Sequence, residues 1–150
     1  MRVVLQVVKQ ASVSIENKIA AEIKKGLLIL VGIEDLDTEQ DLIWLSNKIA
    51  NMRVFTDSKG VMNLSVKDID GEILVVSQFT LQASTKKGHR PSYLKASKAE
   101  VAIPKYQQFV SQLQNDLGKT VETGVFGADM EVALINQGPV TIILDSKNKC

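Results

Sequence analysis

Cysteine and histidine are almost absent from the 150 residues. The single cysteine, Cys150, excludes an intrachain disulfide and any multi-cysteine zinc or iron–sulfur site. It also fits a reducing compartment. The only histidine, His89, excludes a histidine-rich metal cage, and a Ser-His-Asp triad would depend on that one residue. These absences remove the commonest metal-centred and triad-based chemistries.

Long apolar runs are missing as well. No stretch approaches the 18 or more apolar residues that a membrane span needs. The apolar N-terminus carries Arg2 and Lys9 and lacks a cleavage pattern, so we predict a strand there rather than a signal peptide. The cytoplasm is therefore the expected location, with no membrane partner. The net charge of +1 argues against a protein that coats nucleic acid, but it allows a local basic patch.

Predicted strands outnumber predicted helices. Alternating or continuous apolar segments predict strands at Val3–Val8, Ala11–Ile15, Lys18–Ile23, Leu27–Ile33, Val54–Phe55, Ile73–Phe79, Val121–Thr123, Met130–Ile135 and Val140–Leu144. One amphipathic helix is predicted after Thr38, which with Asp41 resembles a capping box, and a second with Pro104 in its first turn. Two helices cannot cover both faces of so much sheet. We therefore expect a single α/β domain over residues 1–150, with two sheet layers and the helices on one side.

Polar residues end one of the buried strands. Ser77, Gln78 and Thr80 follow an apolar run where a buried strand would normally stay apolar. Hydroxyl, amide and backbone N–H groups at a strand end can form an oxyanion site on a rigid scaffold. The alternative is a strand that frays into a turn, with its hydroxyls satisfied locally.

Two further segments invite a functional interpretation. Residues 136–141 read Asn-Gln-Gly-Pro-Val-Thr between two predicted strands, where a hairpin turn is the plain explanation but Gly-Pro is an unusual choice for one. Residues 86–98 hold five Lys or Arg and no acid, which suits either a solvated loop or an anionic partner such as a phosphate backbone. Residues 34–41 show the reverse pattern, with five acids and no base, and we assign them to a helix N-terminus.

Together these segments resemble the D-aminoacyl-tRNA deacylase family over nearly the whole chain. The resemblance rests on four motifs in this order: Ser77-Gln78-Phe79-Thr80-Leu81, Gly88-His89-Arg90-Pro91-Ser92-Tyr93, Phe126-Gly127-Ala128-Asp129-Met130 and Asn136-Gln137-Gly138-Pro139-Val140-Thr141. Each motif alone is weak, whereas the four at this spacing are specific.

The resemblance implies a homodimeric editing enzyme with a three-layer β/β/α sandwich fold. Such an enzyme hydrolyses the ester that joins a D-amino acid, or mischarged glycine, to the 3′-terminal adenosine of tRNA. It implies no metal and no cofactor, because water assisted by the ribose 2′-hydroxyl attacks an already activated ester.

The resemblance also assigns site residues. Ester hydrolysis falls to Ser77, Gln78, Phe79 and Thr80, with backbone N–H groups near Phe79 and Thr80 as oxyanion donors. A cis Gly138–Pro139 motif, inserted into the partner subunit's pocket, is expected to reject L-amino acids. Further substrate-binding residues are Met130, Ala102 and Phe126. Contact with tRNA phosphates falls to Lys86, Lys87 and Arg90.

One position departs from the family pattern. Family members usually carry Arg after the first-strand Gln, where this chain has Gln6-Val7. Valine cannot make polar contacts to the Gly138–Pro139 loop, so either another residue such as Arg2 or Lys9 braces the loop instead, or the loop is looser. Two other functions stay open at this stage: a non-catalytic nucleic-acid-binding module, and an esterase that acts on L-aminoacyl-tRNA.

Overall fold

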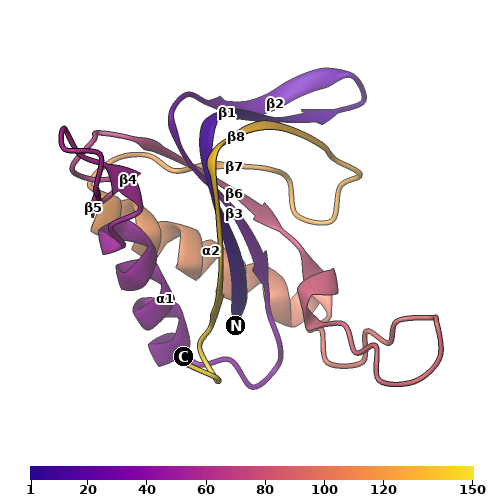
Figure 1. Cartoon of the computed structure of the whole chain (residues 1–150). Coiled ribbons are helices and arrows are strands. Elements are labelled where there is room, and N and C mark those ends of the chain that lie inside the picture. The colour runs from indigo at the N-terminus through magenta and orange to yellow at the C-terminus, as the bar shows by residue number, and fades with distance from the viewer.

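A computed structural model describes all of residues 1–150, as eight strands, two α-helices and one 3-10 turn (Figure 1). In chain order they are β1 (Arg2–Ile15), β2 (Lys18–Ile23), β3 (Gly26–Gly32), α1 (Glu39–Asn51), β4 (Phe55–Thr56), β5 (Met62–Leu64), β6 (Glu72–Ser77), η1 (Phe79–Gln82), α2 (Ala99–Leu117), β7 (Glu122–Thr123) and β8 (Glu131–Asp145).

Six strands form one strongly curled sheet. Its order is β2-β1-β3-β6-β7, and β8 pairs along β1. The centre consists of β3 and β6, which run parallel with Leu27 opposite Ile73 and Val31 opposite Ser77. Both strands are almost wholly buried, which confirms the prediction made from their continuous apolar sequences.

The two faces of the central strands are covered by different parts of the chain. Both helices pack on one face, where a cluster of 22 buried residues includes Leu45 from α1 and Phe109 from α2. A smaller cluster of eight buried residues covers the other face, where the N-terminal hairpin and the first half of β8 fold over. The prediction that the helices lie on one side is confirmed. We expected two sheet layers, and the structure instead has one nearly closed sheet that contains six of the strands.

The start of α1 is as predicted, and the start of α2 is not. Thr38 caps α1 through a complete capping box with Asp41, so the acidic segment does begin a helix. The second helix begins at Ala99 and takes Pro104 into its interior. The prediction from Pro104 was wrong because the preceding turn, with Ala99, Glu100 and Ala102, consists mostly of good helix formers and extends the helix beyond the proline. No helix is long and apolar enough to cross a membrane.

The last 15 residues of the sheet form one strand, where the sequence predicted two strands with residues 136–141 between them. Both halves of β8 pair with β1, and the register shifts between the Gln6–Thr141 and Val8–Asn136 pairs. Four residues, 137–140, therefore oppose Val7 alone and bulge out of the ladder. The hairpin turn, which was the plain explanation of residues 136–141, is therefore not formed, and sequence alone does not show that both halves pair with β1.

Candidate functional site

The carboxyl end of β6 turns directly into a 3-10 turn. Gln78 N still donates to Val31 O at 2.7 Å, and the chain then reverses through η1 with Leu81 N donating to Gln78 O. The first amides of such a turn have no partner within it. Neither the Phe79 nor the Thr80 amide N–H makes a hydrogen bond, and both are therefore available to an acceptor outside the protein.

Contacts from distant segments fix this turn. Arg2 donates from Nη1 to Leu81 O at 2.7 Å, and its Nε and Nη2 both donate to the Asp145 carboxylate. Gln82 is buried and donates from Nε2 to Gly32 O at 2.9 Å. The turn is thus attached to β1, β3 and β8, which gives its free amides a defined direction.

A cavity of about 440 Å³ lies against the strand end and the turn. The structure brings together here five of the sequence-predicted residues: Ser77, Gln78, Phe79, Phe126 and Met130. Its remaining wall is mostly small or apolar, and Asp129 is the one carboxylate that lines it. We call this space the strand-end cavity.

Thr80 and Ala102 lie beside the strand-end cavity rather than on its wall. The Thr80 hydroxyl accepts a hydrogen bond from Gln78 Nε2 at 2.5 Å. Ala102 is buried in the core one turn before Tyr106, whose ring meets that of Phe126 at 5.5 Å. Burial raises the pKa of Tyr106 to about 12, so its hydroxyl stays protonated and donates to Val75 O at 3.3 Å. Tyr106 supports the cavity wall from behind.

Gly138 and Pro139 lie far from the strand-end cavity of their own chain. Their peptide bond is cis, and they line a different cavity of about 340 Å³ together with Val7 and Phe55. By strand register they are level with Ile73, four residues or about 13 Å from Ser77 along β6 and about 14 Å away across three strand spacings. One protomer therefore does not bring the two predicted halves of the site together.

The expected brace for the Gly138–Pro139 loop is not present. Arg2 is engaged with Asp145 and Leu81 O, and Lys9 is exposed and its side chain makes no hydrogen bond. The side-chain hydrogen bond nearest to the Gly138–Pro139 loop along the strand pair is that of Gln6, whose Nε2 donates to Thr141 Oγ1 at 3.4 Å. Val7 instead packs as a buried apolar residue beside the loop.

The basic segment is a projecting loop with a closed neck. Ser84 and Ser92 exchange two backbone hydrogen bonds of 2.8 and 2.9 Å, so the residues between them form an exposed lobe (Figure 1). Lys87 and Arg90 lie on this lobe, and so does His89, which lines neither the strand-end cavity nor any other cavity described here. This placement gives no support to a Ser-His-Asp triad, which would depend on His89.

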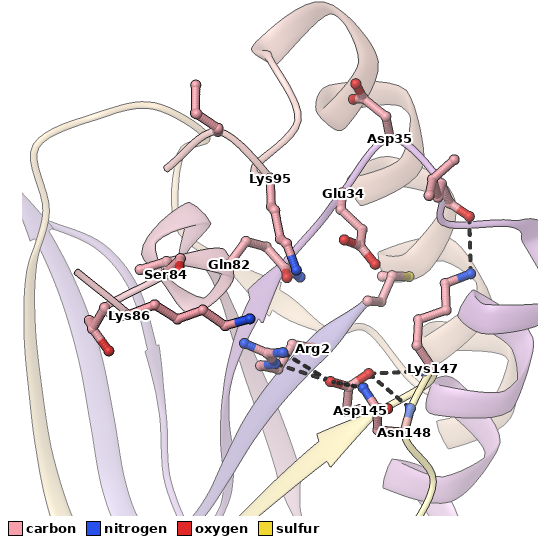
Figure 2. A pocket seen from close by; sticks show the side chains of 15 residues that line it. Arg2, Glu34, Asp35, Gln82, Ser84, Lys86, Lys95, Asp145, Lys147 and Asn148 are labelled. Atoms are coloured by element: carbon pink, nitrogen blue, oxygen red, sulfur yellow. Dashed lines mark hydrogen bonds and ion pairs between the residues drawn. The ribbon is translucent and has the colours of Figure 1, made fainter. Parts of the chain in front are cut away.

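A larger cavity of about 670 Å³ lies between the neck of the lobe and the C-terminal segment. Figure 2 shows Lys86 and Lys95 extending into it toward Arg2, with Glu34 on the facing wall. On its far side Lys147 pairs with Asp41 at 2.7 Å. Burial disfavours the charge of Asp41, but hydrogen bonds from Lys147 and Thr38 outweigh it and hold the pKa of that carboxyl well below its usual range.

Sequence reasoning missed Arg2 and Gln82 as supports of the turn. Arg2 has no motif around it, and its role follows only from β1 passing beside η1. Gln82 is buried in the structure, and the only signal in sequence is that an amide side chain follows closely on the polar strand end.

The fold and the site define a compact α/β protein with free backbone donors at a strand end and a basic lobe beside them. The family described as D-Tyr-tRNA(Tyr) deacylase matches residues 4–145. D-aminoacyl-tRNA deacylase of Flavobacterium psychrophilum is 71% identical over 149 residues, and that of Porphyromonas gingivalis is 62% identical, each alignment covering 99% of both chains. The chain belongs to the D-Tyr-tRNA(Tyr) deacylase family.

Two solved structures share the fold. One, named c-Myc DNA Unwinding Element Binding Protein, is 40% identical with a TM-score of 0.92 and covers 97% of this chain and 98% of its own. The other, described as a probable eukaryotic D-amino acid tRNA deacylase, is 19% identical with a TM-score of 0.81, covers 95% and 97%, and shows the fold alone.

Proposed function

We propose that this protein hydrolyses the ester between a D-amino acid, or glycine, and the 3′-terminal adenosine of tRNA, releasing the free amino acid and intact tRNA. The observation that carries the proposal is the pair of unpaired amides at Phe79 and Thr80 beside the strand-end cavity, in a chain whose close relatives are named D-aminoacyl-tRNA deacylase.

The two amides stabilise the oxyanion that forms when water attacks the ester carbonyl. Backbone donors that are fixed in advance need no rearrangement as that charge develops. Such electrostatic stabilisation of the transition state is often the largest contribution to the rate enhancement. The Thr80 hydroxyl is not the nucleophile, because its hydrogen-bond partner is the Gln78 amide, which cannot take its proton. The ribose 2′-hydroxyl of the substrate orients the water, so the reaction requires neither metal nor cofactor.

The functional unit is a homodimer of three-layer β/β/α protomers. Gly138 and Pro139 of the partner reach the strand-end cavity and occupy the space where an L side chain would go, which selects by steric exclusion. Support for this arrangement comes from the distance between the two regions within one chain. Gly138 and Pro139 are too far from the strand-end cavity of their own protomer to contact a substrate there. Met130 and Phe126 wall the cavity, Ala102 lies behind it, and Lys86, Lys87 and Arg90 contact tRNA phosphates in the cytoplasm.

The test compares two enantiomers of one aminoacyl-tRNA, such as D- and L-tyrosyl-tRNA, in the presence of a chelator. We expect rapid hydrolysis of the D form and no acceleration with the L form. Equal hydrolysis of both would point to an esterase without chiral selection, and hydrolysis of neither would remove the proposal.

A second candidate is a nucleic-acid-binding module without catalysis. The observation in its favour is the 40% identity to a structure named as a DNA-unwinding-element binding protein. That role predicts tight, steeply salt-dependent binding of nucleic acid with no turnover of either enantiomer. Turnover of the D-ester excludes it as the sole function.

A further inference from the structure

Two aromatic rings meet on the surface at the mouth of the strand-end cavity. The rings of Phe79 and Tyr93 pack edge to face with centroids 5.3 Å apart, yet 54% of Phe79 and 42% of Tyr93 remain exposed. Phe79 lines the cavity, whereas Tyr93 does not. The pair therefore extends an apolar surface outward from the cavity toward the basic lobe.

Tyr93 is held in place from both sides along the chain. Ser92 is part of the two-bond neck with Ser84, and Tyr93 O accepts from Ala96 N at 3.0 Å. Ser97 then ties the segment to the end of β3, since its N–H donates to Ile33 O at 3.0 Å. A ring presented on a fixed segment costs little further entropy when it binds a partner.

The segment that carries Tyr93 is basic, since residues 86–98 contain no acid. Lys86 and Lys95 extend into the larger cavity described above, where Glu34 and Asp35 line the facing wall (Figure 2). Exposed aromatic rings beside Lys and Arg are how proteins bind single-stranded nucleic acid, because every base has a face that can stack and each nucleotide carries a phosphate. An acidic peptide would satisfy the cations but leave both rings in water.

We propose that Phe79 and Tyr93 form a stacking site for the unpaired base that precedes the terminal adenosine of the tRNA acceptor end. This inference rests on the proposed function, which places the terminal adenosine and its ester in the strand-end cavity. The preceding nucleotide then leaves through the mouth, past Phe79 and against Tyr93, with its phosphate toward Lys86 and Lys95. The site is specific for a base but not for its identity.

The experiment measures hydrolysis of D-tyrosyl-tRNA and of 3′-D-tyrosyl-adenosine, which lacks the preceding nucleotide. Stacking contributes about 1–3 kcal/mol per base, so Tyr93→Ala should raise KM for the tRNA by about 5- to 150-fold while kcat changes little. The effect on the adenosine ester should be at least fivefold smaller, and Tyr93→Phe should restore the tRNA KM. Leu94→Ala is the matched control, because Leu94 is the next residue and 95% exposed but has no ring.

A binding readout separates this inference from the proposed function. An RNA oligonucleotide ending in adenosine, with fluorescent 2-aminopurine as its penultimate base, should be quenched by the wild type and by Tyr93→Phe but not by Tyr93→Ala. The stacking site is overturned if Leu94→Ala loses as much quenching as Tyr93→Ala. It is also overturned if Tyr93→Ala changes KM equally for the tRNA ester and the adenosine ester. Absence of hydrolysis by the wild type would remove the proposed function and leave the quenching result to be judged alone.

Discussion

Gly32, the last residue of β3, gives the sharpest test of the strand-end site. A β-carbon at this position would lie 2.9 Å from both Gln78 O and Leu81 Cβ, which belong to the turn that carries the free amides. Ordinary contact begins near 3.4 Å, so Gly32→Ala should displace the turn by about 0.5 Å. No other part of the proposed catalytic site is touched.

The displacement sets the expected magnitude. A misplacement of 1 Å can cost about 100-fold in rate, so we expect kcat of Gly32→Ala on D-tyrosyl-tRNA to fall by about tenfold. Crowding a packed site costs about 1–3 kcal/mol of stability. KM should change less than kcat, because the phosphate contacts and Tyr93 lie outside the displaced turn, which carries only Phe79 of the proposed stacking pair.

Gly71→Ala is the matched control. Its β-carbon would lie 2.9 Å from Val66 Cγ2 and 3.1 Å from Ile69 Cδ1, so it crowds side-chain methyl groups remote from the turn. We expect a drop in the urea midpoint no larger than that of Gly32→Ala, with kcat unchanged. If both variants lose stability equally and both keep full kcat, the amides of Phe79 and Thr80 are not the oxyanion donors.

Three further predictions concern the hydroxyl, a buried carboxylate and the basic lobe. Thr80→Ala should keep kcat within about tenfold, since it loses one hydrogen bond worth about 0.5–1.5 kcal/mol; a fall to the uncatalysed rate in single-turnover assays would restore Thr80 as nucleophile. Asp41→Asn should lower the free energy of unfolding in urea by about 1.5–3 kcal/mol at pH 7, through weakened bonds to Lys147 and Thr38. Because folding lowers the pKa of Asp41, this difference should shrink as pH falls below about 4, and a constant difference down to pH 2 would contradict the ion pair. Lys87→Ala should reduce the slope of log KM against log salt by about 0.7–0.9, and an unchanged slope would exclude a phosphate contact there.

Local patterns predicted the centre of the fold well. The glycine-bounded run at 26–33 and the run at 73–79 became the two parallel buried strands, because residues apolar on both faces can only be central. Thr38 and Asp41 fixed the helix start, since a capping box is complete within four residues. Each of these signals is contained in one short segment.

Features that depend on pairing between distant segments were not predictable in the same way. The two halves of β8 look like a hairpin in sequence, and only their shared partner β1 makes them one strand. Arg2 reaches Leu81 O because β1 passes the turn, a contact across 79 positions. The polar strand end was found from its residue types, whereas the backbone N–H groups near Phe79 and Thr80 were named as oxyanion donors through the family resemblance, since backbone donors leave no trace in residue type.

The placement of charge explains how a chain of net charge +1 can bind one RNA end and not coat it. Glu34 and Asp35, from the acidic segment, lie across the same cavity as Lys86 and Lys95, and Asp35 O accepts from Lys105 Nζ at 2.8 Å. The acids therefore weaken the attraction of Lys86 and Lys95 for distant phosphates, and Lys87 and Arg90 at the tip of the lobe make no ion pair. Attraction of phosphate is then strongest over a few nucleotides beside the strand-end cavity and falls off within about 10 Å at 0.1 M salt. A protein with this arrangement gains little from a long RNA duplex. Under the proposed function, recognition therefore comes from the contacts that the two amides and the aromatic pair make with the acceptor end.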